Sequence, residues 1–232
     1  SFSIASQSAL AMPDRQNLEL QGESVSPGIV IGKAFLYRSA THALAIPYAI
    51  RLHEVESELA RIDDAANAVS TDLQVSARRM ENDMGPNLAA IFDAHELILR
   101  DASLRQEIRR EIEEQLIGAA QAVVRVFSRW EQKLRAMTQQ VQRQRADDVV
   151  DLQGRLLRHM AGVTTTALEK MPRGQVLVAH RLLPSETVAL RAREVVGIVL
   201  EFAGIGSHAA LLARGLGIPT VGQIANATLE IL

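Results

Sequence analysis

The chain of 232 residues contains no cysteine, and only 3% of its residues are aromatic. Without cysteine it has neither disulfides nor thiolate metal sites, and it suits a reducing compartment, so we expect a cytoplasmic protein. No uninterrupted apolar run reaches the roughly 18 residues that a membrane span needs. We therefore expect no membrane insertion.

Neither sign of charge dominates, because 25 basic and 27 acidic residues leave a net charge of −2. This balance gives no general attraction to nucleic acid or to an anionic membrane, so no nucleic-acid partner is expected. The histidines at 42, 53, 159 and 180 show no metal-ligand spacing, and no metal site is predicted in this chain. Any phosphate-binding site must therefore depend on a few neighbouring residues rather than on the overall charge of the chain.

Residues 53–160 contain a single proline, Pro86, and their apolar residues recur every three or four positions. This period predicts helices, which we place at 53–82, 86–100, 102–115, 117–144 and 146–160. Two apolar stripes need neighbours, so the helices should form a bundle. The stripes are Leu52, Val55, Leu59, Ile62, Ala66 and Val69, and Val123, Val126, Phe127, Trp130 and Leu134.

Strand-like runs lie on both sides of this helical block. Before it, residues 25–37 and 46–52 are β-branched and punctuated by glycine and proline; after it, strands at 175–179 and 197–201 alternate with helices at 185–193 and 209–216. The order predicts an α/β class with a parallel or mixed sheet. We assign an α/β domain to 23–52 and 162–232, an inserted all-α helical domain to 53–161, and a linker to 1–22.

A glycine-bearing turn after the last of these strands carries a candidate site. Gly204 and Gly206 permit a sharp turn, and Ser207 is placed to cap the next helix, which Gly217 ends. His208 then lies at the positive end of that helix, where free amides favour an anion. Imidazole is a nucleophile near neutral pH, so His208 is a candidate carrier of a phosphoryl group.

The alternative is that His208 merely begins a helix after an ordinary strand-to-helix turn. Two observations favour a functional site. The turn follows the carboxyl end of a predicted strand, where open α/β sheets bind ligands. His208 is also the only ionisable residue between Glu201 and Arg214.

Several segments together resemble the N-terminal half of enzyme I of the bacterial phosphoenolpyruvate-dependent sugar phosphotransferase system. The resemblance is carried by residues 25–33, 90–101, 148–160, 183–187 and 206–222. It implies a phosphohistidine (swivelling) α/β domain with an inserted all-α helical bundle. It also implies that His208 is phosphorylated on Nε2, that the Thr187 hydroxyl holds the other ring nitrogen, that Arg214 assists, and that Gly206 and Ser207 bind the phosphate.

The same resemblance implies the partners. An HPr-type phosphocarrier protein would dock on the helical insert at Phe92, His95 and Leu97, although an amphipathic helix also allows any of these three to be a core residue. A phosphoenolpyruvate-binding domain, with its Mg²⁺, would act in trans or from elsewhere in the full-length chain. No cofactor is expected in residues 1–232, and this segment should not use phosphoenolpyruvate alone.

Three positions depart from the family pattern. Ile205 and Gly206 stand where the family often has arginine and threonine, and Leu88 stands where it has lysine. These departures keep a second class of function open, a carrier-docking module whose histidine is silent. Two further alternatives are the enzyme I-like domain of the dihydroxyacetone kinase phosphotransfer subunit and the swivelling domain of a pyruvate phosphate dikinase-like enzyme, which would not be expected to carry the helical insert.

Overall fold

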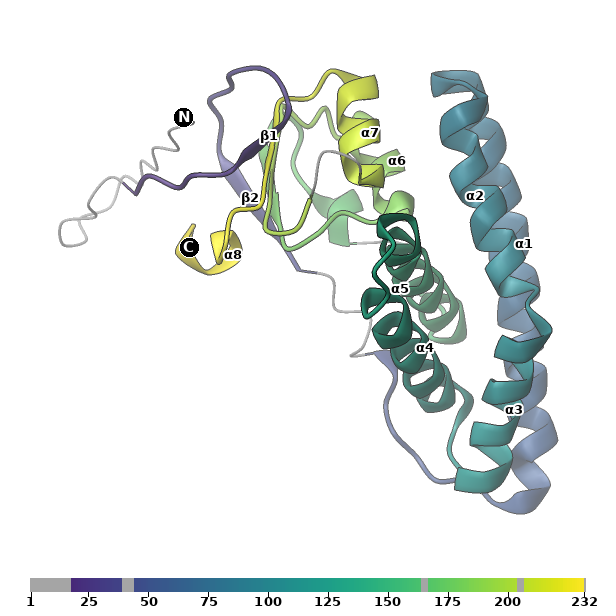
Figure 1. Cartoon of the computed structure of the whole chain (residues 1–232). Helices are drawn as coiled ribbons and strands as arrows, with labels where there is room; N and C mark the ends of the chain where they lie inside the picture. The colour runs from purple at the N-terminus through teal and green to yellow at the C-terminus, as the bar shows by residue number, and fades with distance from the viewer. Residues whose placement is uncertain (1–17, 39–43, 164–166, 204–206, 232) are drawn as a thin grey trace. The chain divides into compact units, whose positions relative to one another are not determined.

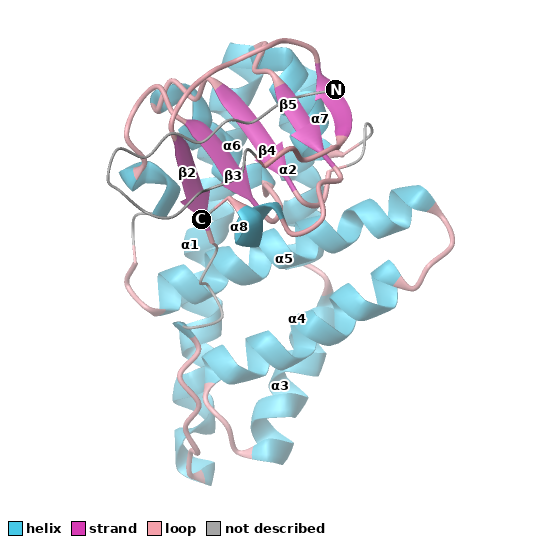
Figure 2. Cartoon of the chain, turned by 90° about the vertical axis from the view of Figure 1, so that its left-hand side faces the viewer, coloured by secondary structure: helices cyan, strands magenta, loops and turns pink. Residues whose placement is uncertain are grey.

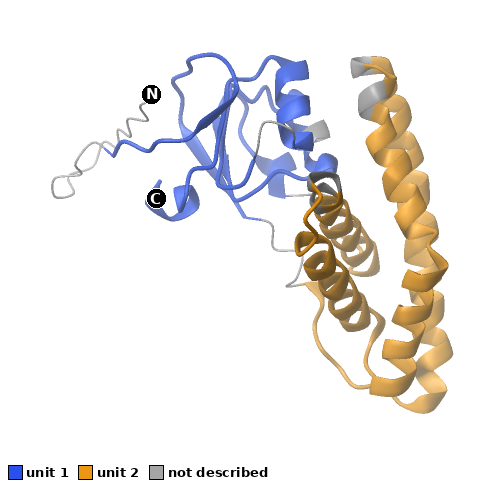
Figure 3. Ribbon diagram, viewed as in Figure 1, with its two compact units in different colours: residues 1–39, 166–232 blue, residues 40–165 orange. Residues whose placement is uncertain are grey.

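A computed structural model describes residues 18–38, 44–163, 167–203 and 207–231 (Figure 1). The chain divides into two compact units (Figure 3). The α/β unit comprises residues 1–39 and 166–232, and the helical unit comprises residues 40–165. The helical unit therefore interrupts the α/β unit at a single point in the sequence.

The α/β unit is built on a five-stranded sheet with the order β1-β5-β4-β3-β2 (Figure 2). The strands are β1 (Glu23–Ser26), β2 (Ala34–Tyr37), β3 (Val176–Ala179), β4 (Gly197–Leu200) and β5 (Thr220–Gly222). Strands β2 to β5 pair in parallel, and only β1 runs antiparallel to its neighbour. Of the two alternatives expected from the sequence, a parallel or a mixed sheet, the sheet is mixed.

Successive side chains of a strand point to opposite faces of the sheet, so each strand contributes to both faces. Helices cover both faces. Leu177 and Ile198 belong to a buried cluster shared with α6 (Pro184–Ala192) and α7 (His208–Leu216). Val178 and Val199 point to the other face, where they meet residues of the short helix α8 (Ala227–Glu230) and the segment before it. The central strands β3 and β4 are apolar on both faces, as strands buried inside a parallel sheet must be.

The strand expected at 46–52 does not form. Only Ala49 makes a bridge, to Ile117, and the Ile50 N–H donates to the Leu116 carbonyl at 2.8 Å. Pro47 removes one amide donor from this segment. Leu52, expected in the buried stripe, instead begins a 3-10 turn (Leu52–Glu54) and is 76% exposed.

The described part of the helical unit contains five long helices, and three of them begin and end close to their predicted positions. The helices are α1 (Val55–Met84), α2 (Pro86–Leu99), α3 (Ala102–Gln115), α4 (Ala119–Arg135) and α5 (Gln140–Met160). The helix predicted over 117–144 is wrong because it runs through a break: α4 stops at Arg135 and Gln139 is extended (φ −75°, ψ 125°). Helix α5 accordingly begins at Gln140, earlier than the predicted 146. No glycine or proline marks this break in the sequence.

The helices pack through the predicted apolar stripes. From Val55 to Val69 the stripe on α1 is buried, and α1 contacts each of the other four helices. Val123, Val126 and Phe127 of α4 are wholly buried, while Trp130 and Leu134 are partly exposed. Apolar side chains along the longest helix, α1, thus form much of the core of the bundle.

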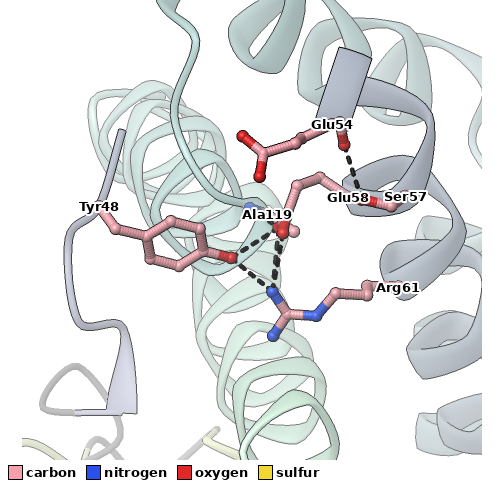
Figure 4. A network of polar contacts seen from close by, with 6 residues as sticks. All are labelled: Tyr48, Glu54, Ser57, Glu58, Arg61 and Ala119. Atoms are coloured by element: carbon pink, nitrogen blue, oxygen red, sulfur yellow. Dashed lines mark hydrogen bonds and ion pairs between the residues drawn. The ribbon is translucent and has the colours of Figure 1, made fainter. Parts of the chain in front are cut away.

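One buried carboxylate, Glu58 of α1, joins three parts of this unit (Figure 4). Its Oε2 accepts a hydrogen bond from the Ala119 N–H at the start of α4 (2.7 Å) and one from the Tyr48 hydroxyl (2.8 Å). Arg61, one turn further along α1, pairs with the same oxygen at 3.0 Å. Glu58 is only 7% exposed and takes the place of a capping side chain for α4, whose N-cap residue is Gly118.

Candidate functional site

His208 is the first residue of α7, as the sequence analysis predicted. Ser207 before it is extended (φ −70°, ψ 157°), and its Oγ accepts a hydrogen bond from the Ala210 N–H at 3.2 Å. Gly217 ends the helix in the left-handed conformation (φ 66°). The His208 side chain is half-buried, so it remains reachable from solvent at the electropositive end of the helix.

The surroundings of α7 hold its first turn against the sheet. Ala203, at the end of the described part of the β4–α7 connection, is buried, and so are Ala209 and Ala210 at the start of α7. The connection leaves the carboxyl end of β4, the edge at which open parallel sheets bind ligands. Gly206, proposed to contact phosphate, lies outside the described residues.

Helix α6 packs against α7 and carries Thr187 as its fourth residue. The Thr187 side chain lies outside the described residues, but its neighbour shows how this end of α6 is held. Glu186 is 1% exposed; it accepts hydrogen bonds from the Leu183 N–H at 2.8 Å and from the Tyr37 hydroxyl at the end of β2. Glu186, in the first turn of α6, therefore links that turn to the preceding residue Leu183 and to Tyr37 of the edge strand β2.

Arg214 follows His208 by six residues, which is about 9 Å along a helix axis. Its guanidinium donates to the Val25 carbonyl of β1 at 3.4 Å. The described contact therefore joins α7 to the antiparallel edge strand. A direct role of Arg214 on the phosphate stays a prediction.

A polar cluster that the sequence analysis missed lies where β3 and β4 end. His180 directly follows β3 and Glu201 directly follows β4, and the His180 Nδ1 lies 2.5 Å from Glu201 Oε2. The other oxygen, Oε1, accepts hydrogen bonds from the Thr228 amide (2.8 Å) and hydroxyl (2.5 Å). The register could have indicated this pair, because Ala179 and Leu200 are partners in the parallel sheet.

Glu201 is ionised in this cluster. It is 9% exposed, and burial raises its pKa, but the hydrogen bonds from Thr228 and His180 outweigh that effect and bring the pKa below its ordinary value. An ionised carboxylate only accepts hydrogen bonds, so the His180 Nδ1 is the protonated ring nitrogen.

The three residues expected at the partner surface differ in exposure. Phe92 is 2% exposed and His95 is wholly buried, whereas Leu97 is 74% exposed. The His95 Nε2 lies 3.0 Å from Asp148 Oδ1 on α5, and its Nδ1 lies 3.9 Å from a carboxylate oxygen of Asp151. His95 and Phe92 therefore belong to the interior of the helical unit, and only Leu97 offers its side chain to a partner in this structure.

Leu97 belongs to an exposed stripe on α2, near the C-terminal end of the helix. The other exposed members are spaced by three or four residues, as one face of a helix requires: Pro86, Ala90, Asp93 and, just after the helix, Arg100. Among the described side chains of this stripe, Leu97 is the one that is large and aliphatic. Among the described residues, no helix combines the length and the apolar character needed to cross a membrane.

Two family descriptions match the chain. Residues 21–145 match "PEP-utilising enzyme, N-terminal", and residues 171–232 match "PEP-utilising enzyme, mobile domain". The first match covers more than half of the chain. The second includes both α6 and α7, and therefore His208.

Similar curated proteins carry the name phosphoenolpyruvate-protein phosphotransferase. The one from Listeria monocytogenes is 33% identical over 203 residues, which are 88% of this chain and 35% of that protein. The one from Staphylococcus carnosus is 30% identical over 213 residues, covering 92% of this chain and 37% of the relative. The chain thus spans about a third of the length of the curated relatives it matches.

Solved structures agree with these matches. A solution structure of enzyme I superposes with a TM-score of 0.66 at 29% identity, covering 91% of this chain and 85% of the other. The N-terminal domain of a nitrogen-type enzyme I gives a TM-score of 0.59 at 25% identity, covering 89% and 84%. The fold, an α/β part combined with a helical bundle, is the one expected from the sequence. The chain belongs to the phosphoenolpyruvate-utilising enzymes, and it corresponds to the N-terminal region of the enzyme I type.

Proposed function

We propose that His208 relays a phosphoryl group between a phosphoenolpyruvate-dependent domain and the histidine of an HPr-type carrier protein. The observation that supports this most strongly is the position of His208. It is the first residue of a capped helix, half-buried, at the carboxyl edge of a parallel sheet, in a segment matched by the mobile domain of phosphoenolpyruvate-utilising enzymes. Mg²⁺ in this proposal is a requirement of the phosphoenolpyruvate-binding domain.

The chemistry needs one free ring nitrogen and a place for the transferred charge. The Nε2 lone pair of His208 attacks phosphorus while the bond from phosphorus to the donor oxygen breaks. In a second displacement, the carrier's imidazole nitrogen attacks the same phosphorus while its bond to His208 Nε2 breaks. The Thr187 hydroxyl holds Nδ1 in this proposal and so leaves Nε2 unprotonated. The first amides of α7 and the Ser207 cap provide an electropositive position for the phosphoryl oxygens.

The carrier docks on the helical unit through the exposed stripe of α2 that contains Leu97. Exposed leucine within a partly polar helix face is typical of a transient protein interface. Phe92 and His95 anchor α2 in the helical unit, because both side chains are buried in its interior. Leu97→Asp should weaken carrier binding, while Val75→Asp, a similarly exposed apolar position on α1, should leave it unchanged. Titration of the carrier by calorimetry measures both.

The phosphoryl transfer itself is tested by incubating the chain with phosphorylated HPr and measuring the mass of the intact protein by mass spectrometry. We expect one acid-labile phosphate on the wild type and none on His208→Ala. His53→Ala is the matched control, because His53 is an exposed histidine of the helical unit. If the wild type gains no phosphate from the carrier, or from phosphoenolpyruvate with an intact enzyme I, the relay is refuted and a silent docking module is the better description.

A further inference from the structure

The His180–Glu201 pair is the strongest unassigned feature of the α/β unit. Glu201 gathers donors from two separate segments, the residue after β3 and the start of α8. Glu201 is only 9% exposed, and each of its two carboxylate oxygens accepts at least one hydrogen bond. A buried carboxylate with matched donors holds its neighbours in one arrangement, since losing a donor leaves a buried acceptor unsatisfied.

His180 also holds the chain immediately after Glu201. The Glu201 N–H donates to the Ala179 carbonyl at 3.1 Å, and the Phe202 N–H donates to the His180 carbonyl at 2.9 Å, so the pairing continues past the ends of both strands. The imidazole of His180 lies 4.7 Å from the Phe202 ring, centroid to centroid. Three independent contacts thus tie His180 to the first two residues of the connection that leads to α7.

This connection ends at the candidate nucleophile. From Glu201 it runs through the buried Ala203 to Ser207 and His208. The positions of Glu201, Phe202 and Ala203 set where the connection leaves the sheet, and the Ser207 cap sets how α7 begins. Phosphoryl transfer depends on placing the attacking nitrogen in line with the phosphorus atom, so a small displacement at this point lowers the rate strongly.

We infer that His180 is a positioning residue for His208. Its Nδ1–H holds Glu201, and thereby the start of the β4–α7 connection, in the geometry that phosphoryl transfer requires. The inference deepens the proposed relay and rests on it for its kinetic consequence. The structural part, that the Nδ1–H donor holds residues 201–203 at the start of the connection, stands on the contacts of His180 alone.

Three substitutions of His180 separate its donor from its ring. His180→Ala removes both, His180→Phe keeps a ring that can pack on Phe202, and His180→Asn keeps a donor at the place of Nδ1. We expect the rate of phosphoryl transfer from phosphorylated HPr to His208 to fall roughly tenfold in the alanine and phenylalanine variants, and to recover largely in the asparagine variant. The affinity for HPr should not change.

His159→Ala is the matched control. His159 is a partly exposed histidine paired with a carboxylate, Asp72, at 2.7 Å, but it lies in the helical unit. Its loss should leave the transfer rate unchanged. Wild-type transfer in His180→Ala, or equal losses in the alanine and asparagine variants, would contradict the inference.

Amide hydrogen exchange gives a readout that does not require phosphate. Exchange at 201–203 and at the first turn of α7 should be faster in His180→Ala and His180→Phe than in the wild type and His180→Asn. Unchanged exchange in all variants would overturn the inference. If the wild type accepts no phosphate but exchange responds as expected, the relay has failed and the positioning of the connection by His180 has not.

Discussion

Glu58→Ala should destabilise the helical unit more than any exposed substitution near it. The change removes the acceptor for the Ala119 N–H, which is fully buried at the start of α4, and leaves that donor without a partner. It also releases the Tyr48 hydroxyl and the Arg61 guanidinium, whose side chain is 43% exposed. The loss therefore comes mainly from the backbone donor and only slightly from the ion pair.

The size of the effect follows from these contacts. An unsatisfied buried donor costs about 1–3 kcal/mol. Losing a negative charge at a helix N-terminus adds about 0.3–1 kcal/mol, and a half-exposed ion pair contributes about 0–1 kcal/mol. We therefore expect the free energy of unfolding to fall by about 3 kcal/mol, drawing on these three ranges. Glu58→Gln retains an acceptor and should cost less.

The contribution of Glu58 should depend on pH. Burial raises the pKa of Glu58, but the hydrogen bonds from Ala119 and Tyr48 and the charge of Arg61 outweigh burial and lower it below the ordinary value. A carboxyl whose pKa is lower in the folded state stabilises the fold above its unfolded-state pKa. That stabilisation is lost as the pH falls through the folded-state pKa. The difference in the free energy of unfolding between the wild type and Glu58→Gln should therefore become smaller in that acidic range.

Urea unfolding followed by far-UV circular dichroism measures the effect, since most of the helical signal comes from the helical unit. Glu114→Ala is the control, because Glu114 is well exposed and pairs only loosely with Arg110, at 3.9 Å. We expect the control to change stability by less than about 0.5 kcal/mol. Equal midpoints for Glu58→Ala and Glu114→Ala would refute the capping role assigned to Glu58.

Three further predictions concern the helical unit. Asp101→Ala should cost about 1 kcal/mol in urea unfolding, because its carboxylate caps α3 by accepting from the Ser103 N–H at 2.7 Å. Gly118→Ala should be destabilising, since an added Cβ would lie 2.2 Å from the Tyr48 ring, and a lower melting temperature would show it. His95→Leu leaves the Asp148 carboxylate without the ring at 3.0 Å. We expect a loss of about 1–3 kcal/mol for removing a hydrogen-bond partner of a buried carboxylate, and an unchanged midpoint would contradict it.

The helices and the sheet were predictable because their signals are local. Proline at the start of α2 and Asp101 before α3 mark the helix ends by mechanisms that act within a few residues. The break between α4 and α5 has no such marker, and the prediction ran through it. The segment at 46–52 has strand composition but a bridge at only one residue, because β structure needs a partner that composition does not supply.

The candidate site divides in the same way. His208 and its Ser207 cap are neighbours in sequence, so the turn, the cap and the helix could all be predicted from one short segment. The His180–Glu201 pair is separated by 21 positions and exists only because β3 and β4 are adjacent in the sheet. The burial of His95 depends likewise on Asp148, 53 positions away on another helix. Contacts between distant residues depend on which elements pack together, and periodicity does not reveal that.

The position of the helical unit between β2 and β3 has a consequence for how the protein folds as it is synthesised. Strand β2 pairs with β3, and β1 pairs with β5, so both early strands wait until the whole helical unit has been made. Helical contacts close early because they are local, whereas pairings between distant segments are slow. The helical unit should therefore fold first, while β2 remains unpaired until β3 is made and β1 remains unpaired until β5 is made.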